Sequence, residues 1–213
     1  MSKSDSHNKE NDAQITPDPE AGRAVIVKFA DWTAALSGSE LVEWNRLPDI
    51  GLYMDQVLTL MDRQLAFYRR GDDDRLLTQP MINNYTKDGL LPRASDKKYT
   101  QGHLALLSVL CSLKPVLSIS DLSVLLKNTQ LDADEKKIYE FFLKAQGDSI
   151  DSVRKNLTPE IDELLNAAAD DGLTADTYKH EMALMALRMA VEARVRIMMT
   201  QKILDLIAAE EKK

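Results

Sequence analysis

The chain has 213 residues, of which 44% are apolar and 29% charged, a composition typical of a globular protein with one large or two small domains. No apolar run approaches the ~18 to 20 residues that a membrane span needs. The N-terminus also lacks the basic-then-apolar order of a secretory signal. We therefore expect a cytoplasmic protein with no membrane partner.

The formal net charge of −7 is unevenly distributed. Residues 75–114 contain six basic and two acidic side chains, so they carry +4 and the rest of the chain carries −11. A positive segment in an acidic chain is typical of a patch that contacts phosphates, and a solvated loop is the alternative.

Features of enzymes and metal sites are missing from the sequence. The single cysteine, Cys111, lies in an apolar stretch, which favours a buried structural side chain. The three histidines are scattered without metal-ligand spacing, and Asp72, Asp73 and Asp74 are typical of a solvated turn. There is no Gly-rich phosphate loop and no nucleophile elbow. We expect no catalytic activity, no cofactor and no metal.

The first half of the chain predicts short elements. Residues 1–23 have the composition of a disordered leader, and residues 24–27 predict a short strand or an extended arm. Apolar spacing predicts a helix from Leu52 to about Gly71. Thr78 is a candidate N-cap for a short helix over 79–87, which Gly89 closes in a left-handed conformation.

A hairpin-like basic loop over 93–98 follows, and then two apolar helices that begin near Thr100 and Ser118. Further on, Asp132 with Glu135 predicts a helix that ends at Gly147 and buries Ile138, Phe141 and Phe142. Thr158 and Pro159 predict a second helix start within a broken segment over 150–170.

The last predicted helix, from Thr174 to about Ala209, is the longest and has two opposed apolar faces. One face comprises Met182, Ala186, Met189, Ala193 and Ile197. The other comprises Leu184, Leu187, Val191, Val195 and Met198. Two such faces need two partners, so this helix either passes through its own domain or packs one face on a second subunit. We favour the second interpretation.

Residues 81–92, which end in Gly89-Leu90-Leu91-Pro92, resemble the recognition helix of the MerR-type winged helix-turn-helix. Residues 98–100 resemble the return of its wing, and residues 117–122 resemble the start of its fourth helix. Residues 48–57 with residues 81–85 also resemble a bacterial domain-of-unknown-function family of MerR-like regulators.

These resemblances imply a mainly α fold in three parts. Residues 1–23 form the leader, and residues 24–127 form a MerR-like winged helix-turn-helix domain with a lead-in. Residues 128–213 form a helical dimerisation or effector region with a long terminal helix. The implied function is a sequence-specific, DNA-binding transcriptional regulator that acts as a homodimer through the C-terminal helix.

On that interpretation the helix over 79–87 enters the major groove, where amide side chains suit adenine and basic ones meet phosphate. The implied contacts are Gln79, Asn83 and Asn84 to bases, Lys87 to phosphate, and Arg93, Lys97 and Lys98 to flanking phosphates or the minor groove. Tyr85 is expected behind the helix as a structural ring.

Two alternatives remain. The first is a helix-turn-helix scaffold that no longer binds DNA and serves protein–protein interaction, because the net charge is −7 and the family's recognition-helix arginine is replaced by Asn83-Asn84. The second is a C-terminal region that senses an unknown small molecule in a pocket of Met182, Met185, Met189 and Phe141.

Overall fold

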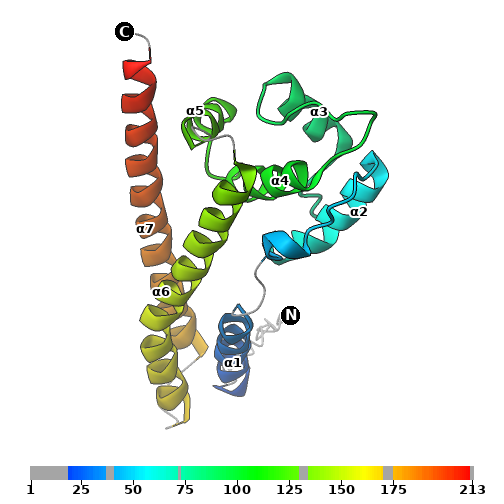
Figure 1. The fold of residues 1–213 in the computed structure, drawn as a ribbon. Coiled ribbons are helices and arrows are strands. Elements are labelled where there is room, and N and C mark those ends of the chain that lie inside the picture. The colour runs from blue at the N-terminus through cyan, green and yellow to red at the C-terminus, as the bar shows by residue number, and fades with distance from the viewer. Residues whose placement is uncertain (1–18, 37–40, 72, 130–133, 170–174, 212–213) are drawn as a thin grey trace, which may run out of the picture.

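In a computed structural model, residues 19–36, 41–71, 73–129, 134–169 and 175–211 are described. The described residues form a mainly helical fold without an extended strand (Figure 1). In chain order the elements are α1 (Pro19–Ala35), η1 (Trp44–Arg46), α2 (Met54–Gln64), η2 (Ala66–Tyr68), α3 (Gln79–Lys87), α4 (Gln101–Leu113), α5 (Ile119–Thr129), α6 (Glu135–Ala169) and α7 (Ala175–Glu210).

The main hydrophobic cluster, the proximal core, forms around α4. Every residue from His103 to Cys111 is buried, because this helix is surrounded by α2, α3, α5 and the first turns of α6 (Figure 1). Ile82 and Tyr85 bring α3 into the same cluster, and Leu122 and Leu126 bring α5. The dense apolar pattern after Thr100 therefore predicted a central helix correctly.

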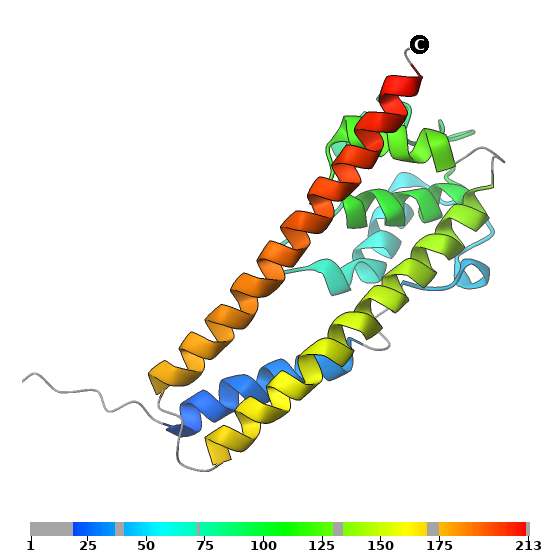
Figure 2. The same ribbon diagram turned by 90° about the vertical axis from the view of Figure 1, so that its left-hand side faces the viewer.

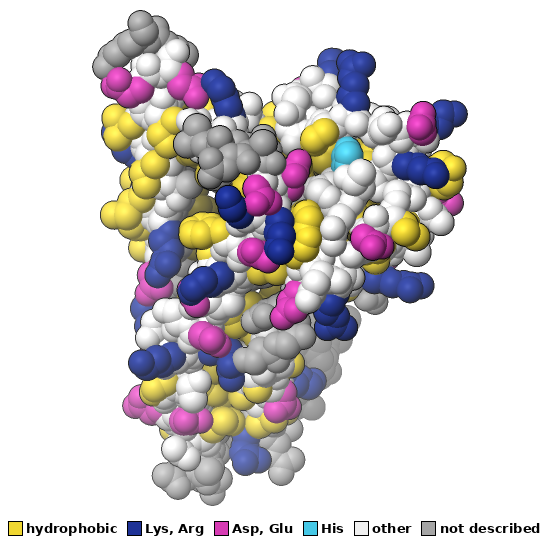
Figure 3. Space-filling view, viewed as in Figure 1, with side chains coloured by type: hydrophobic (Ala, Val, Ile, Leu, Met, Phe, Trp, Pro, Cys, Tyr) yellow, Lys and Arg dark blue, Asp and Glu magenta, His cyan; other side chains and the backbone are white. Residues whose placement is uncertain are grey.

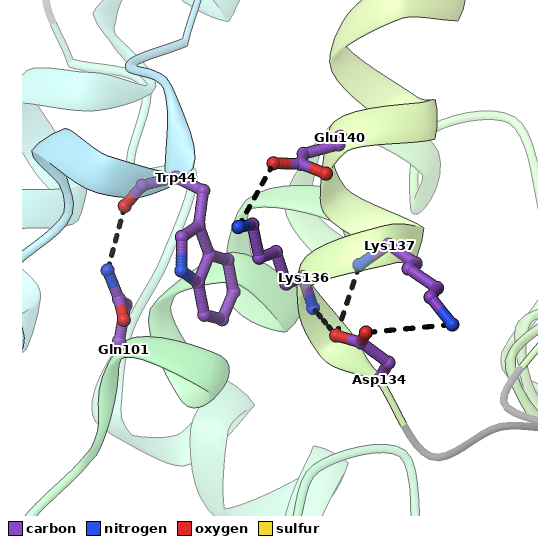
Figure 4. Close-up of polar contacts among 6 residues, drawn as sticks. All are labelled: Trp44, Gln101, Asp134, Lys136, Lys137 and Glu140. Atoms are coloured by element: carbon purple, nitrogen blue, oxygen red, sulfur yellow. Dashed lines mark hydrogen bonds and ion pairs between the residues drawn. The ribbon is translucent and has the colours of Figure 1, made fainter.

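Polar contacts hold residues 42–47, which precede α2, against this core. The Gln101 side chain donates hydrogen bonds to the carbonyl oxygens of Trp44, at 2.8 Å, and Leu47, at 3.2 Å. Figure 4 shows the first of these beside the start of α6, where the Asp134 carboxylate accepts from the backbone N–H of Lys136. On the same helix the hydroxyl of Tyr139 donates to the carbonyl of Val42 at 2.7 Å.

A second, smaller cluster, the distal core, is formed by α1, the far half of α6 and the first half of α7. Its buried members are Ile26, Leu157, Ile161, Tyr178 and Met185. Gly22 of α1 lies against the Tyr178 ring so closely that an added Cβ would be 2.3 Å from Cδ1. Figure 2 shows α1 beside the end of α6 that is distant from the proximal core.

Two long helices, α6 and α7, connect the cores. The chain leaves the proximal core along α6 and returns along α7, whose end lies beside α5 (Figures 1 and 2). Leu204 of α7 is buried in the proximal core. Glu211 accepts from Lys127 Nζ at 2.9 Å and from Asn128 at 3.0 Å. Among the described residues, no helix has the length and apolar character that a membrane crossing needs.

The N-terminal predictions need correction. Residues 24–27 are helical and belong to α1, so the expected strand or arm is wrong. Packing of Ile26 between α6 and α7 outweighs the strand preference of a β-branched run. Residues 1–18 of the expected leader lie outside the described residues, and α1 begins at Pro19, inside the expected range of the leader.

The prediction for α6 is wrong about its end at Gly147, the second start at Pro159 and the burial of Phe141. The helix continues through both Gly147 and Pro159, because side chains such as Leu157 and Ile161 are buried on one face and offset the ~3 kcal/mol cost of an internal proline. Phe141 is 74% exposed, and Tyr139 is buried in its place. Asp132 lies outside the described residues, and Asp134 accepts the first free N–H groups.

The remaining helices agree with the sequence. The helices predicted over 79–87, from Thr100 and from Ser118 are confirmed as α3, α4 and α5. The long terminal helix is confirmed as α7. The helix predicted from Leu52 is shorter than expected, since α2 ends at Gln64 before the η2 turn.

Candidate nucleic-acid interface

The short helix α3 separates a buried face from a polar one. Ile82 and Tyr85 are buried, whereas Gln79, Asn83 and Lys87 are exposed. Asn84 is exposed as well, so all four predicted contact residues of α3 lie on the solvent side. This division follows from helical spacing, which places residues three or four apart on one face.

The two ends of α3 are closed differently. Thr78 occupies the N-cap position as expected, but its hydroxyl forms no capping hydrogen bond. At the other end Gly89 has a φ of +75°, a left-handed value that suits glycine. Leu90 and Leu91 then both donate their N–H to the carbonyl of Tyr85, and both side chains are buried. The expected closure at Gly89 is therefore confirmed.

The basic loop after α3 is a tight hairpin. Lys98 donates its N–H to the carbonyl of Ser95 at 2.8 Å, and the two residues between them, Asp96 and Lys97, have φ values of +50° and +63°. Two consecutive positive φ angles are the mark of a type I′ turn. Arg93, Lys97 and Lys98 are all exposed on this loop.

This hairpin is anchored to the residues before α2. Leu52 and Tyr99 exchange two backbone hydrogen bonds of 2.9 and 2.8 Å in an isolated antiparallel bridge. The Lys98 ammonium lies 5.6 Å from the centre of the Tyr53 ring, which is a cation–π distance. The sequence reasoning missed Tyr53; its signal was an aromatic residue directly before the first helix of the motif.

His103 lies beneath the hairpin and joins it to α4. Its Nδ1 accepts a hydrogen bond from the backbone N–H of Thr100 at 3.1 Å, and its ring contacts Tyr99 edge to face. Burial lowers the pKa of His103, against weaker opposing effects of the Pro92 and Arg93 backbone and of Glu135. The neutral ring therefore serves as a capping residue.

The Tyr85 hydroxyl and the Cys111 thiol lie behind α3 and remain protonated at neutral pH. Burial raises the pKa of the Tyr85 hydroxyl to about 12, with a smaller contribution from Cys111, and burial also raises the pKa of the Cys111 thiol to about 12. The buried Tyr85 agrees with the expected structural ring. Cys111 is only 6% exposed, as the sequence indicated. Neither group offers chemistry to a bound partner.

All seven predicted contact residues thus lie on the surface of two adjacent chain segments, α3 and the hairpin. Figure 3 shows Lys and Arg side chains on the side of the molecule where α3 lies, with a few acidic ones among them. Among the described residues, no group of three or more His, Cys, Asp or Glu side chains is placed to hold a metal ion.

A cavity of about 550 Å³ lies between α6 and α7, near the distal core. It is lined by Glu160, Glu163, Leu164, Ala167, Thr177, Glu181, Leu184, Met185 and Arg188. The expected pocket of methionines and Phe141 is not formed. Met185 contributes to this cavity, Met182 and Met189 pack in the distal core, and Phe141 is exposed.

Comparison with known proteins adds one finding. The family described as "Domain of unknown function (DUF1836)" matches residues 42–142, a little under half of the chain. This range spans both stretches that resemble a domain-of-unknown-function family, so that part of the expectation is confirmed. The match ends within α6 and leaves out the whole distal core. No curated protein and no solved structure matches the chain.

Proposed function

We propose that the protein is a cytoplasmic, sequence-specific DNA-binding transcriptional regulator with a MerR-like winged helix-turn-helix, acting as a homodimer. In this proposal α2 and α3 form the helix-turn-helix, the hairpin over 92–99 is the wing, and α4 and α5 support both. The function requires no catalysis and no cofactor.

The observation that carries the proposal is the pairing of α3 with the anchored type I′ hairpin. A nine-residue helix with an exposed amide-rich face is followed, after Gly89 and two buried leucines, by a hairpin that presents three cations. The Leu52–Tyr99 bridge holds the hairpin in place, so its cations occupy defined positions. A positioned helix and a positioned basic loop suit one groove and its flanking phosphates.

The side chains divide into two classes of contact. The amides of Gln79, Asn83 and Asn84 suit the donor and acceptor pair on the major-groove edge of adenine. Lys87, Arg93 and Lys97 supply charge to phosphates, which positions the helix without reading sequence. The contact with the Tyr53 ring restricts the side-chain rotamers of Lys98, so Lys98 offers its ammonium to a phosphate from a fixed position.

The long helix α7 supports the dimer. Five of its residues, Leu184, Leu187, Val191, Val195 and Met198, are each between 44% and 60% exposed. The opposite face includes Met182 and Met189, which pack in the distal core, and the partly buried Ile197. This face is covered within the chain only in part, because Ala186 and Ala193 are exposed, and the other face is available for a second copy.

The test of DNA binding is an electrophoretic or fluorescence titration of the purified chain against genomic fragments, including the region upstream of its own gene. Salt-sensitive binding at about 50 mM salt is expected. If no fragment binds at that salt concentration, the proposal is wrong.

Substitutions separate the two kinds of contact. Lys97→Ala with Lys98→Ala is expected to weaken binding to all sequences and to lower the salt dependence by about two counterions. Asn83→Ala is expected to relax preference at one base pair, by about 1–3 kcal/mol. Lys28→Ala with Lys155→Ala removes two exposed cations of α1 and α6 outside the interface and should leave binding unchanged.

The second candidate function is small-molecule sensing by a scaffold that does not bind DNA. The 550 Å³ cavity between α6 and α7 favours it, since its volume lies in the range of ligand sites. A thermal-shift screen is the test: a compound whose stabilisation is lost in Met185→Trp supports sensing. Sensing together with failed DNA binding would favour this candidate over the first.

A further inference from the structure

His103 lies at the base of the hairpin, between the segment that enters it and the segment that leaves it. On the leaving side, its Nδ1 accepts a hydrogen bond from the backbone N–H of Thr100 at 3.1 Å and lies 2.7 Å from the Thr100 hydroxyl. The Tyr99 ring meets the imidazole edge to face, with 5.5 Å between the ring centres. On the entering side, the backbone of Pro92 and Arg93 lies close enough to act on the ring. One side chain, only 7% exposed, therefore joins both ends of the hairpin.

The hydrogen bonds of this ring require its neutral form. Because Nδ1 is an acceptor, the neutral ring carries its proton on Nε2. A second proton would make Nδ1 a donor that points at the N–H of Thr100, which is also a donor. The bond that caps α4 and fixes the end of the hairpin would then be lost, in a buried site that disfavours charge. Nε2 is buried as well and forms no hydrogen bond within the described part of the chain.

The charged groups around the ring do not reverse this preference. Burial has the largest influence and lowers the pKa of His103 from its ordinary 6.5, against smaller opposing effects of the hairpin backbone and of Glu135 in the first turn of α6. The Arg93 side chain is exposed on the hairpin, and α4 itself carries no other charged side chain. The Tyr99 hydroxyl stays neutral, because burial raises its pKa.

We propose that His103 is the residue that positions the hairpin, and that the hairpin docks only on the neutral ring, so that acid loosens it and weakens DNA binding. A docked hairpin holds its three cations, Arg93, Lys97 and Lys98, in defined positions, and a loosened hairpin does not. The effect on DNA binding rests on the proposed function, whereas the docking of the hairpin on His103 does not.

The direction of this pH dependence sets it apart from ordinary charge effects. Protonation of exposed side chains adds positive charge, so acid by itself strengthens contacts with phosphates. Here the open hairpin leaves His103 to take up a proton near pH 6.5, and the docked hairpin allows it only at lower pH. The contribution of the neutral ring is therefore complete above pH 6.5 and is lost as the pH falls below it, by up to about tenfold in the docking equilibrium per pH unit.

NMR of the full chain tests the docking without DNA. Ring-nitrogen shifts should show that His103 is neutral at pH 7.5 and titrates below pH 6.5. The Leu52–Tyr99 bridge supplies the readout, because its two N–H groups are protected only while the hairpin is docked. Their protection factors should fall about three- to tenfold between pH 6.5 and 5.5, while those in the middle of α4 stay constant. A ring that titrates at or above pH 6.5, or unchanged protection of the bridge, overturns the proposal.

Two substitutions separate the charge of the ring from its role as a cap. His103→Gln keeps an acceptor for the Thr100 N–H, as glutamine does at this position of a capping box, and cannot be charged. It should keep the hairpin docked and abolish the loss of protection in acid. His103→Ala should lower the protection of both bridge N–H groups at every pH. The same acid profile in His103→Gln as in the wild type overturns the proposal.

His180→Gln is the matched control for these variants. His180 is the other histidine among the described residues, and it is exposed on α7, outside the hairpin. Its replacement removes one titrating imidazole and should leave the acid profile of the Leu52–Tyr99 bridge as it is in the wild type. A profile that His180→Gln flattens as much as His103→Gln does would overturn the assignment to His103.

The same variants connect the hairpin to DNA. The affinity of the wild type for one fragment, divided by that of His103→Gln, should fall about three- to tenfold from pH 7.5 to 5.5, with a lower salt dependence in the wild type. Other titrating groups are common to both proteins and cancel in this ratio. Acid loosening without binding to any fragment leaves the docking on His103 intact and removes the proposed function. DNA binding with a constant ratio does the reverse.

Discussion

The proximal and distal cores are built differently although one chain and two shared helices form both. Among the described residues the proximal core buries 23 side chains from several elements, whereas the distal core buries five from three helices. The proximal core also contains the region that matches a known family, and the distal core lies outside it. The comparison indicates that the larger core is stabilised by many buried side chains and the smaller one by few, so single substitutions should affect the smaller core more.

The largest expected effect comes from removing a side chain at the centre of the proximal core. Leu104 has no exposed surface, so Leu104→Ala leaves a cavity in the proximal core and should lower the free energy of unfolding by about 3–4 kcal/mol. Urea denaturation followed by circular dichroism measures it. A loss below 1 kcal/mol would mean that this core is loosely packed.

A single methyl group should disrupt the distal core. Gly22→Ala places a Cβ 2.3 Å from Cδ1 of Tyr178, which must move, at a cost of about 1–3 kcal/mol. Hydrogen exchange should show faster exchange in α1 and the far half of α6, with α4 unchanged. Gly71→Ala is the control, because no atom lies within 4 Å of its added Cβ. Equal effects of the two substitutions would contradict the description of the distal core.

High pH should destabilise the proximal core. Burial raises the pKa of Cys111 from 9.0 to about 12, so its neutral form contributes stability that is complete below pH 9 and is lost as the pH rises toward 12. The free energy of unfolding should fall by up to about 1.4 kcal/mol per pH unit in that range. Cys111→Ala should flatten the dependence between pH 9 and 10, below the value of 10.0 at which Tyr85 and Tyr139 begin to contribute in the unfolded chain. An unchanged slope in urea titrations would show that the thiol is solvated.

The smallest effect is expected on α6, where two neighbouring aromatic residues differ. Phe141 is 74% exposed, so Phe141→Ala should change the free energy of unfolding by less than about 0.5 kcal/mol. Tyr139, two residues earlier, has no exposed surface and serves as the reference for a buried aromatic. Thermal denaturation of both alanine variants measures the difference. A large effect of Phe141→Ala would reveal a contact that the isolated chain lacks.

Some residues of the candidate interface could be predicted from their sequence neighbours, and one could not. Thr100, Gly89 and the dense leucines of α4 predicted helix positions well, because capping, left-handed turns and apolar spacing are local properties. The exposure of Asn83 followed from the same spacing, and that of Lys97 followed from its place in a polar loop. Tyr53 was missed, because its contact with Lys98 joins residues 45 positions apart in the chain.

The sequence alone determined the helices of the proximal core, the tight basic loop and the two opposed faces of α7, since each depends on neighbours a few residues away. Only the tertiary structure decided that residues 24–27 are helical and that α6 continues through Gly147 and Pro159. In those places the burial of Ile26, Leu157 and Ile161 in the distal core outweighs local preference. The tertiary structure also separated the face of α7 that packs in the chain from the one that remains exposed, because that distinction depends on where α1 and α5 lie.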